Sequence, residues 1–359
     1  MRRFKVGILG ATGMVGQRFI TLLNEHPWFS VAAVAASPSS AGKTYAEAAE
    51  GRWVMEDPLS SEVAAMTVLD ATADRAKIAE NVDFVFSAMA MPKNETRQLE
   101  ESYAKLECPV ISNDSAHRFT PDVPMIIPEV NPRHAEVIPS FRKRLGITRG
   151  LIAVKSNCSL QSYLPALHPL TEYGLEKVLA CTYQAISGAG KTFKSWPEMV
   201  DNVIPYISGE EEKSEVEPLK IWGTLQDGII IPANEPAITV QCIRVPVTDG
   251  HMAAVFASFV KKPPLDEITE RWNSFYGIPQ ALALPSAPRK FIHVFTENDR
   301  PQTRLDRGLE GGMAVSVGRL REDSQYDIKF VSLSHNTLRG AAGGGVLLAE
   351  LLCAEGYIQ

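Results

Sequence analysis

FKVGILGATGMVG, residues 4–16, is the stretch that decides the fold class of this chain. Its apolar start predicts a buried first β-strand over 4–11, and Gly10, Gly13 and Gly16 then precede an apolar-periodic helix. Glycine permits a tight turn and lets backbone N–H groups approach a pyrophosphate at the helix N-terminus. The spacing is G-x-x-G-x-x-G, a weak motif by itself, so the strand before it and the helix after it carry the prediction of a dinucleotide site. A plain glycine-rich turn is the alternative.

Strand and helix patterns alternate over roughly the first 150 residues, which predicts a parallel, doubly wound sheet. Longer β-rich stretches follow, and they predict a second, mixed or antiparallel sheet with a few helices on one face. The final run, 338–356, reads as a helix that is amphipathic after its glycines. The expected strands are 4–11, 29–37, 66–71, 83–90 and 109–114, then 177–187, 237–247, 252–260, 313–321 and 326–334; helices are expected at 13–26 and 95–107.

Composition narrows the class of protein. The 359 residues suffice for two domains, and a net charge of −6 argues against a nucleic-acid or anionic-membrane partner. No apolar run reaches the roughly 18 residues of a membrane span, and we interpret MRRFKVGILG as the first strand of a cytoplasmic protein rather than a signal peptide. The odd number of cysteines and the absence of a CxxC pair argue against disulfides and bound metal. The cysteines are Cys108, Cys158, Cys181, Cys242 and Cys353.

The end of the second expected strand bears on the choice of cofactor. Residues 35–40 read AASPSS, and Gly42 and Lys43 follow. An NAD site usually places Asp or Glu here on the ribose 2′-hydroxyl, whereas the hydroxyls of Ser37 and Ser40 and the nearby lysine suit a 2′-phosphate. The sequence therefore favours NADP, with an ordinary polar loop as the alternative.

The stretch GAGKT, residues 188–192, ends like a phosphate-binding P-loop. That motif requires glycine five positions before Gly190, where Ala185 stands. A tight glycine turn after a strand remains, and it could approach a cofactor ring.

KSNCSLQS, residues 155–162, places Cys158 after an apolar strand and before a helical run. Free cysteines are usually buried fillers. At a helix N-terminus, however, the helix dipole lowers a thiol pKa and favours the thiolate, which also needs a proton-transfer partner. Sequence pattern does not choose that partner among the seven histidines, His26, His117, His134, His168, His251, His293 and His335.

Several ordered motifs together resemble the aspartate-semialdehyde dehydrogenase family, in its archaeal and fungal branch. They cover essentially the whole chain: GATGMVG at 10–16, SNCS at 156–159, YQAISGAGK at 183–191, NVIPYISGEEEK at 202–213, RVPVTDGH at 244–251 and SHNTLRGAAGG at 334–344. The resemblance implies NADPH-dependent reductive dephosphorylation of L-4-aspartyl phosphate to L-aspartate 4-semialdehyde, in the biosynthesis of lysine, threonine, methionine and isoleucine.

The resemblance also implies residue roles in catalysis. Cys158 would displace phosphate to form a thioacyl enzyme, and hydride transfer would give a thiohemiacetal that collapses to the aldehyde. His251 would be the acid/base group and Gln184 would help to place the acyl intermediate. Without the resemblance, Cys158 could be an inert thiol and His251 could merely occupy a hairpin turn.

The implied substrate carries negative charge on its α-carboxylate and phosphate and positive charge on its ammonium, and each of these groups needs a partner. The resemblance implies that Arg244 binds the α-carboxylate and that Glu210 holds the ammonium, with Glu211 or Glu212 as alternatives. Lys213, three residues after Glu210, would share its helical face. As a charge pattern alone, GEEEKSEVE could be a solvated helix face, and Arg118 a surface ion-pair residue. The implied substrate-binding set is Arg244, Glu210, Lys213, Arg118 and Asn157, with Lys213 and Arg118 on the phosphate.

The resemblance further implies a glyceraldehyde-3-phosphate dehydrogenase-like plan and a homodimer or homotetramer. The expected division is an NADP-binding Rossmann domain over 1–156, an α+β catalytic and dimerisation domain over 157–335, and a C-terminal helix, 336–359, that packs back on the first domain. The implied NADP-binding residues are Gly10, Thr12, Gly13, Met14, Val15, Ser37, Ser40, Ser87, Ser187, Gly188, Asn336 and Thr337.

Two positions depart from the family pattern. Ser39 stands where many relatives carry arginine, which weakens the expected selection of NADP over NAD, and Leu160 stands where threonine is common. Malonyl-CoA reductase of the same branch is the nearest alternative, but its substrate has no ammonium for Glu210 to bind. The substrate of N-acetyl-γ-glutamyl-phosphate reductase is acylated at its nitrogen, so that enzyme would not require Glu210 either. A non-catalytic NADP-binding sensor, with an inert Cys158, is the alternative from another class.

Overall fold

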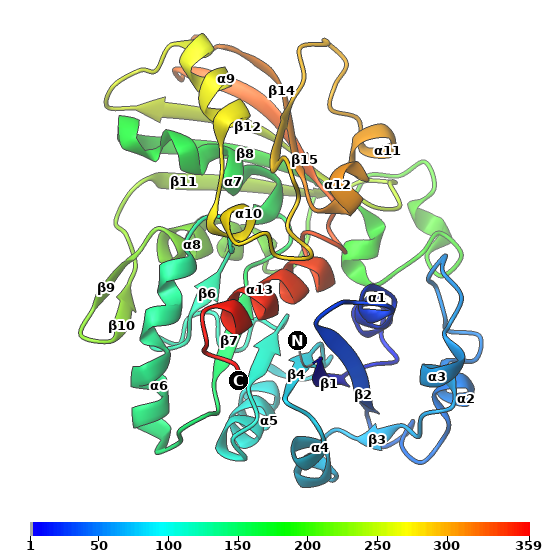
Figure 1. Ribbon diagram of the computed structural model, residues 1–359. Coiled ribbons are helices and arrows are strands. Elements are labelled where there is room, and N and C mark those ends of the chain that lie inside the picture. Colours follow the sequence, from blue (N-terminus) through cyan, green and yellow to red (C-terminus); the bar gives the residue numbers. More distant parts are fainter. Residues whose placement is uncertain (1–2) are drawn as a thin grey trace.

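In the computed structural model, which describes residues 3–359, the N-terminal half forms a seven-stranded parallel sheet in the order β3-β2-β1-β4-β5-β7-β6 (Figure 1). This confirms the predicted doubly wound sheet, and its strand order reverses between β1 and β4, where such sheets bind ligands. The strand expected at 66–71 is limited to two residues. The strands are β1 (Phe4–Leu9), β2 (Phe29–Ala36), β3 (Leu69–Asp70), β4 (Phe84–Ser87), β5 (Val110–Ser112), β6 (Met125–Ile126) and β7 (Ile152–Lys155).

Helices cover both faces of this sheet. The first, α1, begins directly after the glycine turn and buries Phe19, Ile20 and Leu23. The ring of Phe19 stacks on Phe86 of β4 at 4.3 Å between centroids, which fixes the helix against the sheet. The helices are α1 (Met14–Leu23), α2 (Tyr45–Ala49), α3 (Ser61–Ala64), α4 (Arg75–Asn81), α5 (Lys93–Lys105), η1 (Pro132–Val137) and α6 (Ile138–Leu145).

The C-terminal half builds a six-stranded mixed sheet in the order β11-β8-β12-β15-β14-β13, as predicted. Buried and less buried residues alternate strictly along β12, and α7 and α9 pack on the buried face. The strands are β8 (Leu175–Gln184), β11 (Ala237–Arg244), β12 (His251–Phe259), β13 (Ile292–Val294), β14 (Val315–Glu322) and β15 (Ile328–Ser334), and a separate hairpin joins β9 (Thr224–Gln226) to β10 (Ile229–Ile231). The helices are α7 (Leu160–Leu167), η2 (His168–Tyr173), η3 (Ile186–Ala189), η4 (Pro197–Met199), α8 (Glu210–Ile221), α9 (Leu265–Ser274), α10 (Ile278–Ala281), α11 (Thr303–Asp306) and α12 (Leu309–Gly312).

The last helix, α13 (Ala342–Ala354), differs from its prediction in two ways. It is not amphipathic, because every residue from Ala342 to Leu352 is buried: it lies against α1, β5 and β7, between the two sheets (Figure 1). It is also shorter than 336–359, because residues before Ala342 form a compact turn. There a Cβ on Gly340 would lie 2.5 Å from the carbonyl oxygen of Asn336.

One hydrophobic core extends from the parallel sheet through α7 into the mixed sheet. The register then brings strand ends together: Arg244, the last residue of β11, pairs with Gln184, the last residue of β8. His251, the first residue of β12, pairs with Ser334 of β15. These ends face the turn that carries Cys158. Within residues 3–359, no helix is long and apolar enough to cross a membrane.

Candidate active site

The turn that carries Cys158 connects β7 to α7 and is held by the side chain of Asn157. The Oδ1 atom of Asn157 accepts hydrogen bonds of 2.7 Å from both the backbone N–H and the hydroxyl of Ser159. α7 begins at Leu160, so Cys158 lies in the turn just before the helix rather than inside its first turn. Cys158 as a whole residue is partly exposed.

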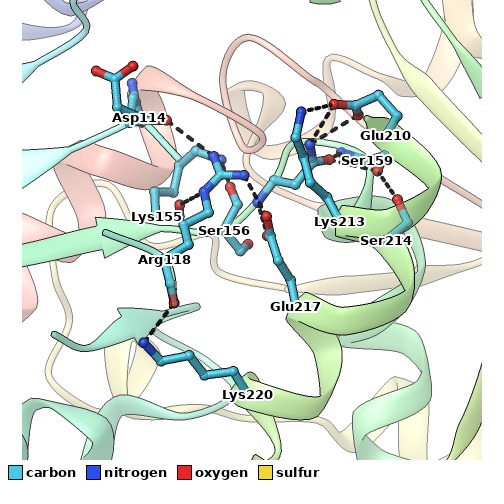
Figure 2. A network of polar contacts seen from close by, with 12 residues as sticks. Asp114, Arg118, Lys155, Ser156, Ser159, Glu210, Lys213, Ser214, Glu217 and Lys220 are labelled. Carbon is cyan, nitrogen blue, oxygen red and sulfur yellow. Dashed lines mark hydrogen bonds and ion pairs between the residues drawn. The ribbon is translucent and has the colours of Figure 1, made fainter. Parts of the chain in front are cut away.

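Helix α8 presents two carboxylates to this turn (Figure 2). Both oxygens of Glu210 accept from Nδ2 of Asn157, at 3.1 and 3.0 Å, and Nζ of Lys213 lies 2.9 Å from Oε1. Glu211 instead accepts from Gln241 and Cys242 on β11. Glu212 is exposed. Of the three glutamates left open by the sequence, only Glu210 therefore lies against the Cys158 turn.

Glu217 is the residue that sequence reasoning missed. Its side chain is fully buried; Oε1 accepts from Arg118 at 2.7 Å and Oε2 accepts from the backbone N–H of Asn157 at 2.7 Å. The signal available was its spacing, because a residue seven positions after Glu210 lies on the same face of a helix. The guanidinium of Arg118 also donates to the carbonyls of Lys155 (3.1 Å) and Asn113 (3.2 Å), so Arg118 is a buried structural anchor of the turn as well as a candidate ligand.

The ends of β8, β11 and β12 also lie near this turn. Nδ1 of His251 accepts from the backbone N–H of Ala185 at 3.1 Å, and the carbonyl of Ala185 accepts from Arg244 at 2.7 Å. Gly188 packs on both side chains: a Cβ there would lie 2.9 Å from Arg244 and 3.0 Å from His251. Gln184, at the end of β8, has its Nε2 3.5 Å from Glu210 of α8. These predicted residues therefore surround one site.

The surroundings shift the ionisation of the site's nucleophile and base candidates. Burial raises the pKa of the Cys158 thiol, as does the charge of Glu210, opposite to the lowering expected from the helix dipole. Three cations act in the other direction: Lys155, Arg118 and Arg244. Burial, followed by the charge of Arg244, lowers the pKa of His251 to about 3, so its ring is neutral at neutral pH.

The glycine turn after β1 has the shape of a dinucleotide cradle. Gly10 has φ +81°, and a Cβ there would lie 2.3 Å from the carbonyl oxygen of Ala88. A Cβ on Gly16 would likewise lie 2.3 Å from the carbonyl oxygen of Gly10. Gly13 caps α1 without any side-chain hydrogen bond to the helix N–H groups, so these donors remain for a ligand. Thr12, Met14 and Val15 lie in the same turn and first helical residues.

The other predicted cofactor residues fall into three places. Ser37 and Ser40 form a turn after β2, where the Ser37 hydroxyl lies 3.0 Å from that of Ser39. Ser87 ends β4 and is fully buried. Asn336 donates to Ser187 at 2.8 Å and accepts from Gly250 N–H at 2.8 Å, so it joins three segments beside His251; Thr337 follows it. GAGKT forms a tight turn with Gly190 at φ +66°. No group of three or more His, Cys, Asp or Glu side chains that could hold a metal occurs among the described residues.

This chain is similar to known proteins over nearly its whole length. Residues 5–138 match the family described as "Semialdehyde dehydrogenase, NAD binding domain", and residues 167–339 match "Semialdehyde dehydrogenase, dimerisation domain". The aspartate-semialdehyde dehydrogenase of Methanothermobacter thermautotrophicus is 43% identical over 97% of this chain and 98% of the relative. That of Aspergillus fumigatus is 42% identical over 99% and 98%. The crystal structure of the Candida albicans aspartate-semialdehyde dehydrogenase with NADP has a TM-score of 0.89 at 38% identity and covers 99% of this chain and 100% of its own.

Proposed function

Because the chain belongs to the aspartate-semialdehyde dehydrogenase family, we propose that it reduces L-4-aspartyl phosphate to L-aspartate 4-semialdehyde and phosphate. The observation that carries this proposal is the convergence of Cys158, Glu210 and Arg244 on one turn, from elements far apart in sequence. A thiol, a carboxylate and a guanidinium are the groups that an amino-acid acyl phosphate requires.

Cys158 is the proposed nucleophile. Its Sγ would attack the acyl carbon, and the phosphate would leave as the thioacyl bond forms. The ring of His251 accepts from Ala185 at Nδ1, so the neutral ring carries its proton on Nε2, which is buried and makes no hydrogen bond in the described part of the chain. That N–H would donate to the developing oxyanion and exchange a proton with it. Gln184 would help to place the acyl group.

The substrate charges would be divided between two sides of the site. Arg244 would bind the α-carboxylate, and Glu210 would bind the ammonium, with Asn157 holding the Glu210 carboxylate in place. Lys213, which lies 2.9 Å from Glu210, and Arg118 would bind the phosphate. Malonyl-CoA has no ammonium for Glu210 to bind, which favours the aspartyl substrate over the thioester.

The residues present fit a bound NADP. The glycine turn leaves room for a pyrophosphate at the N-terminus of α1, and the turn after β2 presents the hydroxyls of Ser37 and Ser39 without an acidic side chain. Gly10, Thr12, Gly13, Met14 and Val15 would hold the pyrophosphate, Ser37 and Ser40 the 2′-phosphate, and Ser87, Ser187, Gly188, Asn336 and Thr337 the nicotinamide side. When bound, NADPH would supply the hydride for the reduction.

The proposal includes the organisation of the protein. Residues 1–156 would be the cofactor domain and 157–335 the catalytic domain, with 336–359 returning to the first. The half-exposed outer face of the mixed sheet and the match to a dimerisation domain support a homodimer or homotetramer. The proposed location is the cytoplasm.

The test is an assay of purified protein with L-aspartate semialdehyde and NADP, with and without phosphate, and with NAD in parallel. We expect NADP reduction that depends on phosphate. Malonyl-CoA with NADPH is the parallel arm. Reduction of malonyl-CoA by folded protein that ignores L-aspartate semialdehyde contradicts the proposal.

A further inference from the structure

The orientation of His251 leaves the formation of the thiolate without an explanation. Since Nδ1 accepts from the backbone N–H of Ala185, the neutral ring carries its proton on Nε2. A protonated Nε2 can donate to an oxygen but has no lone pair to accept the proton of a thiol. The site therefore needs another group that favours the ionised form of Cys158.

Lys155 directly precedes the turn that carries Cys158 and is buried. It is the last residue of β7, its side chain is 3% exposed, and its Nζ donates to the carbonyl of Ser156. Arg118 binds the Lys155 carbonyl at 3.1 Å (Figure 2). On the other side, a Cβ on Gly344 of α13 would lie 3.3 Å from Cδ of Lys155, so the helix closes over the lysine stem. The ammonium is therefore buried within the protein.

Ser156 is held by a second buried chain of contacts. Its hydroxyl accepts from Gln161 at 2.8 Å, and the oxygen of Gln161 accepts from Arg339 at 3.0 Å. Arg339 makes a two-bond ion pair with Glu129. The carbonyl that binds the ammonium therefore belongs to a turn held by buried hydrogen bonds, and the same turn carries Cys158 two residues later.

We propose that Lys155 is a positioning residue of this site, whose buried ammonium stabilises the Cys158 thiolate. Within the described chain, Lys155 makes no salt bridge with a carboxylate. The charges that act on it come from Cys158, from Glu217 on α8, and from the cations Arg118 and Arg339.

Burial and the charges of the turn act in opposite directions on the pKa values of Lys155 and Cys158. Burial lowers the pKa of Lys155 to about 7, and the charge of Cys158 is the largest favourable contribution to the ammonium. Reciprocally, of the three cations that lower the pKa of Cys158, Lys155 acts more strongly than Arg118 or Arg244. The charges of the thiolate and the ammonium therefore stabilise each other, against the cost of burying both groups.

The test measures the rate of Cys158 alkylation by iodoacetamide against pH, with the modified peptide identified by mass spectrometry. Lys155→Met and Lys155→Gln remove the charge and keep much of the stem. We expect the midpoint of the rate profile to rise by at least about one pH unit, which is about tenfold slower alkylation at neutral pH. Lys220→Met is the control, because Lys220 is also a buried lysine but donates only to the backbone carbonyls of residues 118, 120 and 123.

Circular dichroism selects the variants that fold, and one folded Lys155 variant is sufficient. An unchanged alkylation profile overturns the proposal. If the KM for phosphate rises while the profile is unchanged, Lys155 is a phosphate ligand instead. A shifted profile with lower kcat and unchanged phosphate KM supports it. The inference rests on the proposed function for its catalytic meaning, but alkylation needs no substrate. Failure of the proposed reaction would therefore leave the thiol measurement intact.

Discussion

Replacing Glu217 by glutamine tests whether the Cys158 turn depends on α8. Glu217 uses one carboxylate oxygen for Arg118 and the other for the backbone N–H of Asn157, both at 2.7 Å. Glutamine keeps the shape but turns one oxygen into an NH2 group. In either orientation a donor then faces a donor, so one of the two bonds is lost.

The magnitude follows from burial. Glu217 is fully buried and Arg118 is only 6% exposed, so Glu217→Gln leaves a buried guanidinium without its carboxylate. Breaking a buried ion pair from one side costs about 3–5 kcal/mol. Arg118 keeps its bonds to the carbonyls of Lys155 and Asn113, so we expect the lower end, about 3 kcal/mol. That is a large share of the roughly 5–15 kcal/mol by which proteins are stable.

Urea unfolding followed by tryptophan fluorescence measures this change, and Glu212→Gln is the matched control. Glu212 lies on the same helix but is exposed, so its substitution is expected to change the free energy of unfolding by less than about 0.5 kcal/mol. The Glu217 variant should also lose at least about tenfold in kcat at a temperature where it is folded, because Asn157 positions the nucleophile turn. A loss of stability below about 1 kcal/mol would refute the reasoning.

Two further predictions use other parts of the structure. Gly188→Ala places a methyl group against Arg244 and His251, so we expect at least about a tenfold loss of kcat/KM with an unchanged melting temperature. The control is Gly308→Ala, because a Cβ at Gly308 meets nothing within 4 Å. Equal kcat/KM values for the two variants would contradict this packing. Burial, aided by the charge of Asp114, raises the pKa of Glu100 to about 8, so the folded protein keeps a proton that the unfolded chain releases above its ordinary pKa. The protonated Glu100 therefore contributes fully to stability at low pH, and this contribution is lost as pH rises toward 8. The parent protein should lose about 2 kcal/mol of unfolding free energy between pH 6 and 8 that Glu100→Gln does not lose, as measured by urea unfolding. A difference that does not change with pH would show that Glu100 is ionised in the folded state.

The parts of the fold that sequence predicted are those set by local pattern. The glycine turn, the alternation of strands and helices, and the β-rich second half each depend on neighbours within a few residues. The C-terminal helix shows where this fails. Its glycines and leucines look amphipathic in isolation, yet the structure buries Ala342 through Leu352, because a second layer of protein covers the side that a surface helix would expose.

The candidate site shows the same limit. Spacing on a helix brought Glu210 and Lys213 together correctly, and their ion pair confirms it. The contacts of Glu217 with Arg118 and Asn157 join residues 99 and 60 positions apart, which no local pattern reports. Likewise the helix dipole, a local effect, favoured a lowered pKa for Cys158, whereas burial by distant segments raises it.

The central claim is that Cys158 carries the acyl group, and the most direct measurement is rapid-quench peptide mass spectrometry. The protein is mixed with L-aspartate semialdehyde and NADP without phosphate, so that the acyl group has no acceptor except water. We predict one equivalent of rapidly formed NADPH and an aspartyl thioester on the peptide that contains Cys158, with neither in Cys158→Ala. Phosphate-dependent turnover with no adduct on that peptide, or an adduct on another cysteine, would contradict the account.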